Sequence, residues 1–167
     1  MTFLIISGYF DLSAGVVMGL SANLVIILQR SGFSIGLSIV TTLVVSFFLG
    51  SINGILVTKA RISPFIVTLA MMITGRGLTY FLCGGDQIDS PYERFMDYAN
   101  GKIWGISFLS ITFIVLLTVS AIVMKYSKHG RDTFAVGGNA DAAFNAGINV
   151  DRVKTINFII CSLSAGV

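Results

Sequence analysis

Residues 35–57, IGLSIVTTLVVSFFLGSINGILV, form an unbroken apolar run whose length decides the fold. A transmembrane α-helix needs about 20 consecutive, mostly apolar residues to cross the hydrocarbon core of a bilayer. This run meets that length, carries no charged residue and shows no alternation with a period of two. It therefore predicts a membrane-spanning helix and not a strand of a transmembrane barrel.

Further apolar runs on both sides indicate that the chain crosses the membrane several times. We expect spans over residues 12–28, 64–82 and 103–124, and the start of another over residues 155–167. The composition agrees, because 54% of the 167 residues are hydrophobic and 11% are charged, whereas soluble domains average roughly 25% charged residues. We predict an all-α membrane protein: a polytopic bundle of transmembrane helices, with one short coupling helix on the cytoplasmic side.

Charged residues in the loops predict the orientation of the bundle. Basic residues follow the span over 35–57 and fill the loop over 125–154: Lys59, Arg61, Lys125, Lys128, Arg131, Arg152 and Lys154. The loop over 83–102 instead carries mainly acidic residues: Asp86, Asp89, Glu93 and Asp97. We expect the basic loops on the cytoplasmic side and the acidic loop outside, with Tyr92, Tyr98 and Trp104 near the outer boundary. Because the net charge of +3 comes from these loops, it does not indicate a nucleic-acid partner.

Four polar side chains lie within or beside the apolar runs: Asp11, Asn23, Asn53 and Arg76. A charge at the bilayer centre costs at least about 2.5–3.5 kcal/mol on insertion scales, so such residues need partners or a wet cavity. Asp11 lies at a predicted break between two helical pieces, where it either caps the second piece or faces a translocation pathway. Arg76 has three alternatives, which are pairing with Asp11, bonding free carbonyl groups and contacting a substrate. We expect Asn53 to form a hydrogen bond between helices.

Two pairs of glycines spaced four residues apart predict grooves for close helix packing: Gly15 with Gly19, and Gly50 with Gly54. The single histidine, His129, is expected to be a solvated loop residue. The sequence offers no nucleophile–base set and no phosphate-binding loop of the G-x-x-x-x-G-K-[ST] type. We therefore expect no catalytic residue, no cofactor and no metal site in this chain.

Residues 130–150, GRDTFAVGGNADAAFNAGINV, form a polar, glycine-rich island between two apolar runs. The signals follow in order: Gly137 and Gly138 to break the chain, Asn139 to cap a short helix over 140–146, and Gly147 to end it. An isolated helix of about two turns is unstable in water, so it must pack on its own domain or on a partner. We therefore predict a docking helix for a separate subunit that drives the protein.

Four motifs, in order along the chain, resemble one family. They are Gly8-Tyr9-Phe10-Asp11-Leu12-Ser13-Ala14-Gly15, Gly50-Ser51-Ile52-Asn53-Gly54, Pro64-Phe65-Ile66-Val67-Thr68-Leu69 with Arg76-Gly77-Leu78, and the island from Gly130-Arg131 through Gly137-Gly138-Asn139 and Ala142-Ala143 to Gly147-Ile148. They resemble the membrane permease subunits of bacterial ATP-binding-cassette importers for ribose and related sugars, a group that includes the autoinducer-2 importers. Tyr9 and Phe10 depart from the family's usual Gly-Ile. The resemblance covers essentially the whole chain.

The resemblance implies a permease subunit of the bacterial cytoplasmic (inner) membrane. Such subunits form the translocation pathway, pair as homo- or heterodimers, work with a cytoplasmic ATPase and receive the solute from a periplasmic binding protein. The island would be the segment that couples to the ATPase, through Gly130, Arg131, Gly137, Gly138, Asn139, Ala142, Ala143 and Gly147, with Ala142 and Ala143 as the closest contacts. Family members are roughly twice as long, and the apolar run over 155–167 is short, so we expect this chain to be part of a longer permease.

Two other functions remain open from the residues alone. A segment of an ion-coupled secondary transporter would need membrane carboxylates, and Asp11 alone is available. A non-transporting membrane scaffold would be insensitive to changes in the intramembrane polar residues.

Overall fold

The computed structural model describes residues 1–85, 88–92, 95, 101–103 and 106–167. Its helices are α1 (Thr2–Ile6), α2 (Ala14–Arg30), α3 (Ile35–Thr58), α4 (Pro64–Cys83), α6 (Phe108–Tyr126), α7 (Lys128–Gly138), α8 (Ala140–Asn145) and α9 (Val150–Gly166). The short strands β1 (Lys102–Ile103) and β2 (Ile106–Ser107) pair antiparallel just before α6. The predicted bundle of transmembrane helices is confirmed.

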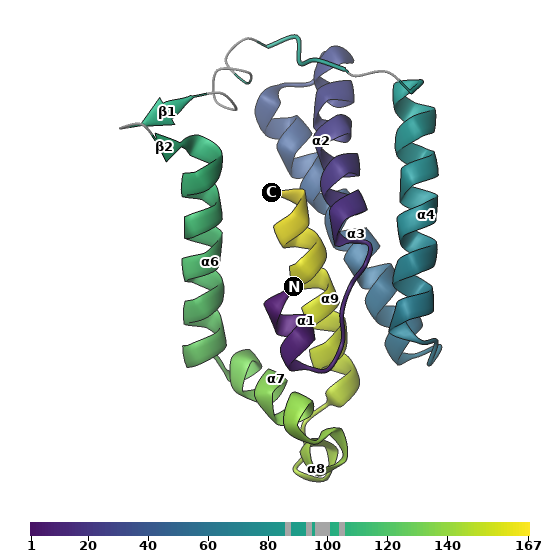
Figure 1. Ribbon diagram of the computed structural model, residues 1–167, viewed down its shortest axis with the longest axis vertical. Coiled ribbons are helices and arrows are strands. Elements are labelled where there is room, and N and C mark those ends of the chain that lie inside the picture. Colours follow the sequence, from purple (N-terminus) through teal and green to yellow (C-terminus); the bar gives the residue numbers. More distant parts are fainter. Residues whose placement is uncertain (86–87, 93–94, 96–100, 104–105) are drawn as a thin grey trace.

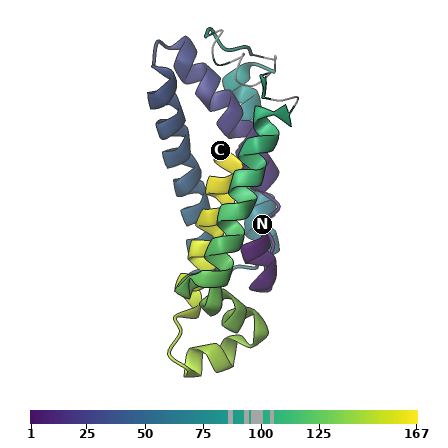
Figure 2. The same ribbon diagram turned by 90° about the vertical axis from the view of Figure 1, so that its left-hand side faces the viewer.

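Helix α9 lies in the middle of the bundle, where it packs against α1, α2 and α3 (Figure 1). Helix α6 stands to one side and meets the other helices through α7 (Figure 1). Helices α7 and α8, which we call the lobe, extend from one end of the elongated molecule, and the β1–β2 pair lies at the other end (Figure 2). Both α1 and α9 contact the lobe: α1 packs against α7, and α9 packs against α7 and α8.

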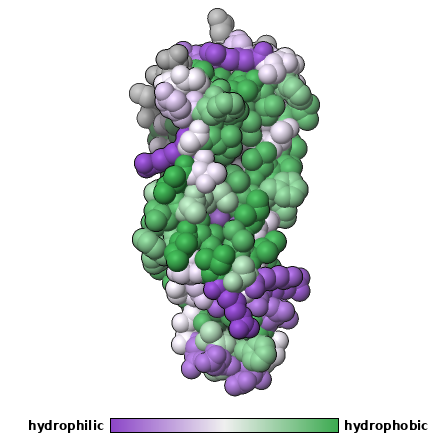
Figure 3. All heavy atoms as spheres, turned by 90° about the vertical axis from the view of Figure 1, so that its right-hand side faces the viewer, coloured by the Kyte–Doolittle hydropathy of each residue, from purple (hydrophilic) through white to green (hydrophobic). Residues whose placement is uncertain are grey.

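Three of the described helices are long and apolar enough to cross a membrane, namely α3, α4 and α6. Helix α3 has 24 residues, which at about 1.5 Å per residue gives about 36 Å, more than the roughly 30 Å hydrocarbon core. Helix α2 is apolar but shorter, with 17 residues. The molecular surface is hydrophobic over its middle and hydrophilic towards both ends (Figure 3), as a lipid environment requires.

Small residues follow the buried side of α3 at a spacing of four: Ser38, Thr42, Ser46, Gly50 and Gly54. The hydroxyl groups of the first three donate to carbonyl oxygens one turn earlier in the chain, at 2.9–3.0 Å. The Oγ of Ser46 also lies 3.0 Å from the Oγ of Ser21 on α2. A Cβ on Gly50 would lie 2.9 Å from the Cα of Ile159 in α9, and one on Gly54 would lie 2.9 Å from the Cα of Thr155. The close packing predicted for Gly50 and Gly54 is confirmed, because lipid-embedded helices associate through such small residues.

Two helices begin well away from their predicted starts, and one helix was not predicted. Helix α6 begins at Phe108 and not at residue 103, because the residues before it form the β1–β2 pair. Helix α9 begins at Val150 and not near residue 155, since the Oδ1 of Asn149 accepts a hydrogen bond from the N–H of Arg152 at 2.9 Å and caps a polar first turn. The loop over 125–154 contains α7, which is capped by the Ser127 Oγ. Hydropathy alone misses these polar turns.

Part of the predicted outer loop falls on residues that the structure does not describe. These are Asp86, Glu93, Asp97, Tyr98 and Trp104. The described part of this loop packs on the turn between α2 and α3, where the Nε of Arg30 donates to the carbonyl oxygen of Asp89 at 3.0 Å. The hydroxyl of Tyr92 also donates to the carbonyl oxygen of Phe33 at 3.3 Å.

Candidate functional site

The chain between α1 and α2 is not helical, and Asp11 organises it. Gly8 lies in the left-handed region with φ +82°, which glycine adopts without strain. The Oδ1 of Asp11 accepts hydrogen bonds from the backbone N–H of Ser13 at 2.8 Å and from its hydroxyl at 2.5 Å. The predicted break between two helical pieces is confirmed. The predicted cap is corrected, because Ser13 is the residue that precedes α2 and Asp11 holds the turn leading to it.

Asn53 ties this break to α3. Its Nδ2 donates to the Oγ of Ser13 at 3.0 Å, so the predicted hydrogen bond between elements is confirmed. Asp11 and Asn53 are 1% and 0% exposed. Within the described part of the chain, the Oδ2 of Asp11 and the Oδ1 of Asn53 have no hydrogen-bond partner. Buried polar atoms without partners are uncommon in folded proteins.

A cavity of about 480 Å³ lies between α2 and α4. Asn23, Arg76 and Thr79 supply polar groups to its wall, and Gly15 and Gly19 also line it. A Cβ on either glycine would meet no atom of the described residues within 4 Å. The close packing predicted for Gly15 and Gly19 is therefore wrong, because these glycines leave space for the cavity.

Arg76 is exposed at the wall of this cavity. Among the residues that the structure describes, it forms no ion pair and no hydrogen bond, so neither the predicted pairing with Asp11 nor bonding to free carbonyl groups occurs. The neighbouring Gly75 makes the close contact between α4 and α2, since its Cβ would lie 2.9 Å from the Cγ1 of Val16. Asn23 donates to the carbonyl oxygen of Gly19 at 2.9 Å within α2. The guanidinium of Arg76 thus lies beside the cavity without a partner among the described residues.

The lobe is fixed to the bundle by two glycines of α7. A Cβ on Gly130 would overlap the carbonyl oxygen of Met124, at the end of α6. A Cβ on Gly137 would overlap the carbonyl oxygen of Ile6, at the end of α1. Gly138 has open space around it and is the last residue of α7. The predicted chain break is confirmed there, whereas the packing role of Gly137 was not predicted.

A buried amide connects α7 to α1 and α9. The Nδ2 of Asn157, on α9, donates to the carbonyl oxygen of Phe3 at 3.3 Å and to the Oγ of Ser7 at 3.2 Å. Its Oδ1 lies 2.8 Å from the Nε2 of His129 and accepts from the Oγ1 of Thr133 at 3.5 Å. The His129 ring also stacks on the Phe3 ring, with centroids 6.1 Å apart. The prediction that His129 is a solvated loop residue is wrong, because α7 folds back onto the bundle. We call these residues the Asn157 node.

Helix α8 begins and ends close to the predicted positions. The Oδ1 of Asn139 accepts a hydrogen bond from the N–H of Ala142 at 3.0 Å, and Gly147 follows the helix with φ +83°. Val136, Ala143 and Val153 form a small core that joins α7, α8 and α9. Ala143 is 4% exposed, so it packs inside the lobe. This corrects its expected place at a partner contact.

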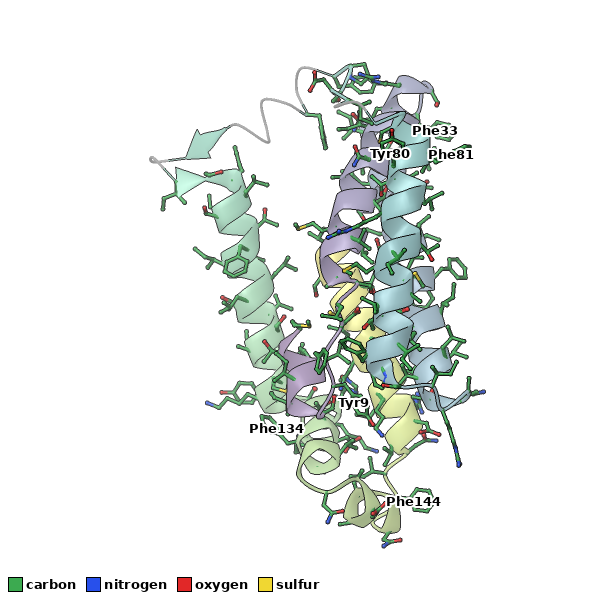
Figure 4. All side chains as sticks on the ribbon, turned by 45° about the vertical axis from the view of Figure 1, so that its right-hand side comes forward. Tyr9, Phe33, Tyr80, Phe81, Phe134 and Phe144 are labelled. Carbon is green, nitrogen blue, oxygen red and sulfur yellow. The ribbon has the colours of Figure 1, made fainter. Side chains whose placement is uncertain are left out.

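The surface of α8 presents a large aromatic side chain that the prediction did not include. Phe144 is 70% exposed, and the neighbouring Ala142 is also exposed. Phe144 and Phe134, on α7, project from opposite sides of the lobe (Figure 4). Arg131 is exposed as well, with its Nη1 bonded to the carbonyl oxygen of Tyr126 at 3.3 Å. An aromatic residue within a polar island was the available signal for this surface.

The fold and these sites define a polytopic helical membrane protein with a small helical lobe at one end of its bundle. Over residues 1–167 the chain matches the family described as "Branched-chain amino acid transport system / permease component". The chain belongs to this family of multi-pass membrane permease components.

Similar curated proteins include several sugar permeases. The ribose import permease protein RbsC of Bacillus subtilis (strain 168) is 36% identical over 98% of this chain and 51% of its own length. The L-arabinose ABC transporter permease protein AraH of Azospirillum brasilense is 34% identical over 99% of this chain and 49% of its own length. The galactofuranose transporter permease protein YtfT of Escherichia coli (strain K12) is 28% identical over 100% of this chain and 49% of its own length. The chain thus spans about half the length of these relatives, and no solved structure matches it significantly.

Proposed function

We propose that the protein forms part of the translocation pathway of an ABC importer for a sugar or sugar-like solute, such as a ribose-type monosaccharide or autoinducer-2. One observation carries the proposal: a single chain combines a cavity that has a few polar groups in its largely apolar wall with a helical lobe fixed firmly to one end of the bundle. The names of the relatives support a sugar, since ribose, arabinose and galactofuranose all occur among them.

The cavity between α2 and α4 is the proposed part of the pathway. Sugar hydroxyl groups both donate and accept hydrogen bonds, and the wall offers an amide from Asn23, a guanidinium from Arg76 and a hydroxyl from Thr79. Gly15 and Gly19 keep this side of α2 free of side chains. In this proposal Arg76 contacts the passing solute, because its guanidinium has no partner in the described protein.

The lobe is the proposed coupling segment for a cytoplasmic ATPase. Phe144 and Ala142 supply the contact surface of α8, with Phe144 as the anchor in a groove of the ATPase. The Asn157 node and Gly137 join the lobe to α1 and α9, so a displacement of α8 would move the helices of the bundle. A second permease subunit and a periplasmic solute-binding protein complete the proposed assembly.

Uptake by proteoliposomes tests this proposal against the two alternatives. The full-length permease, reconstituted with its ATPase and binding protein, should take up a sugar only when ATP is supplied to the ATPase. Uptake should persist when an ionophore collapses the ion gradients. Arg76→Gln should lower uptake while the complex stays assembled. Uptake driven by an ion gradient without ATP would identify a secondary transporter, and normal cellular uptake without this chain would identify a scaffold.

A further inference from the structure

A second cavity lies at the lobe end of the bundle, away from the proposed pathway. It has a volume of about 340 Å³ and is formed where α3 ends, α4 begins and α9 begins. Arg61 and Lys154 line it and carry cationic groups, and Tyr9 and Ser63 line it and carry hydroxyl groups. Thr58 also lines it, but its hydroxyl donates to the carbonyl oxygen of Gly54 at 2.8 Å. Cations and hydroxyl donors that converge on one cavity are suited to a phosphate group.

The ammonium group of Lys154 is held in place by an aromatic ring. Its Nζ lies 4.8 Å from the centroid of the Tyr9 ring, a cation–π contact that leaves the ammonium free to meet an anion. Asp151 also lines the cavity, yet over the residues that the structure describes neither Lys154 nor Arg61 forms an ion pair. Two cations therefore face one carboxylate, and the cavity keeps a net positive charge.

The backbone at Arg61 is unusual. Arg61 has φ +53°, in the left-handed region where residues with a side chain are uncommon. It lies in the turn that closes α3, where the N–H of Ala60 donates to the carbonyl oxygen of Ile55 at 3.3 Å and the N–H of Ile62 donates to that of Leu56 at 3.2 Å. Glycine is the usual residue in such helix-ending turns. An arginine here gives up some backbone stability and places a guanidinium in the cavity wall.

The cavity also borders an apolar surface. Phe65 and Ile66, in the first turn of α4, are 50% and 59% exposed. Because α4 is one of the helices long enough to span the membrane, its first turn lies near the membrane boundary. Figure 3 shows hydrophilic side chains directly beside the hydrophobic surface towards this end of the molecule. A ligand that fits both features has a phosphate group joined to hydrocarbon chains.

The geometry points to a binding site for the phosphate of an anionic phospholipid, with its acyl chains along Phe65 and Ile66. Such a lipid joins the turn after α3 to the second turn of α9, where Lys154 lies. Since α9 also packs against the lobe, the bound lipid stabilises the position of the helix that α7 and α8 contact. This inference does not depend on the proposed sugar transport.

Photocrosslinking tests the site in the full-length protein. The protein is placed in phosphatidylcholine nanodiscs that contain a photoreactive phosphatidylglycerol or, in a parallel sample, a photoreactive phosphatidylcholine. The phosphatidylglycerol probe should label the peptides around Ile62 and Lys154 in preference to the phosphatidylcholine probe. Equal labelling by the two probes, or labelling elsewhere only, would overturn the proposal.

Matched variants separate lipid binding from folding. Arg61→Gly removes the guanidinium and relieves the left-handed backbone, so the fold should be at least as stable. Arg61→Gly and Lys154→Gln should each weaken phosphatidylglycerol labelling about fivefold, the effect expected per cation near an anionic surface. Lys125→Gln is the control, because Lys125 lies over the Tyr126 ring at 5.4 Å in a similar contact but lines neither cavity. Unchanged labelling in both site variants contradicts the site.

A competition arm separates the lipid from free phosphate. Inorganic phosphate in large excess should leave the phosphatidylglycerol labelling unchanged, because it lacks the acyl chains that contact α4. Displacement of the probe by inorganic phosphate alone would show a site for a soluble anion and overturn the assignment to lipid.

Discussion

Replacing Gly137 with alanine should detach the lobe from the bundle. The added Cβ would overlap the carbonyl oxygen of Ile6 and would lie 2.8 Å from its carbonyl carbon and 3.3 Å from the Cα of Ser7. All three neighbours are backbone atoms, so no side-chain rotation can relieve the overlap and α7 must move away from α1. Overpacking of this kind costs about 1–3 kcal/mol. We expect a cost near the upper end of this range, because the clash is with backbone atoms that cannot rotate away.

The net magnitude follows from two opposing effects. Alanine is favoured over glycine inside a helix by at most about 1 kcal/mol, which offsets part of the overpacking. The remaining penalty of about 2 kcal/mol corresponds to a roughly 30-fold shift towards the detached lobe. Gly138→Ala is the matched control, since a Cβ there would meet nothing within 4 Å. It should keep the lobe attached.

Hydrogen exchange in membranes provides the assay for this pair of variants. Amides of α7 should exchange faster in Gly137→Ala than in the wild type. Those of α3 should not change, because α3 packs mainly against α9, α2 and α4, whereas the clash falls on Ile6 and Ser7. Gly138→Ala should resemble the wild type. Equal exchange in the two variants would refute the idea that Gly137 holds the lobe against α1.

Three further predictions concern the bundle and its orientation. Gly50→Ala should lower the free energy of unfolding by about 1–3 kcal/mol in a denaturation assay, because its Cβ meets the α9 backbone; Gly15→Ala, with open space around it, should have almost no effect. Asn157→Leu should destabilise the contact between lobe and bundle by about 1–3 kcal/mol, since it leaves buried partners without hydrogen bonds, and limited proteolysis should then cleave α7 faster; an unchanged cleavage rate contradicts the role of the Asn157 node. Single cysteines at Lys128 and Asp89, in a background free of other cysteines, should react from opposite sides with a membrane-impermeant thiol reagent; labelling of position 128 from outside intact cells would reverse the orientation.

The helices that span the membrane could be predicted because hydropathy reports burial in lipid directly. The run over residues 35–57 corresponds to α3 almost residue for residue. Helix α8 could also be predicted, since its cap Asn139 and the terminal Gly147 act through local backbone geometry. The residues that determine where such a helix begins and ends lie within a few positions of each other, so they can be recognised in the sequence alone.

The contacts between distant segments could not be predicted in the same way. A spacing of four places Gly15 and Gly19 on one face of α2, as it does Gly50 and Gly54 on α3, but it does not say whether a helix or a cavity lies opposite. Nothing in the sequence around His129 indicates that it lies beside Asn157, which is far away along the chain. Ala143 likewise faces the interior of the lobe for reasons set by α7 and α9.

The most direct measurement for the coupling role of the lobe compares two exposed phenylalanines. Phe144→Ser and Phe134→Ser remove similar side chains from opposite sides of the lobe (Figure 4). Loss of an aromatic anchor at a protein interface costs at least about 2 kcal/mol, a roughly 30-fold loss of affinity. Phe144→Ser should therefore reduce ATPase co-purification and sugar uptake strongly, while Phe134→Ser should keep both and the two variants should express equally. A Phe144→Ser permease that retains its ATPase and transports sugar like the wild type would contradict the account.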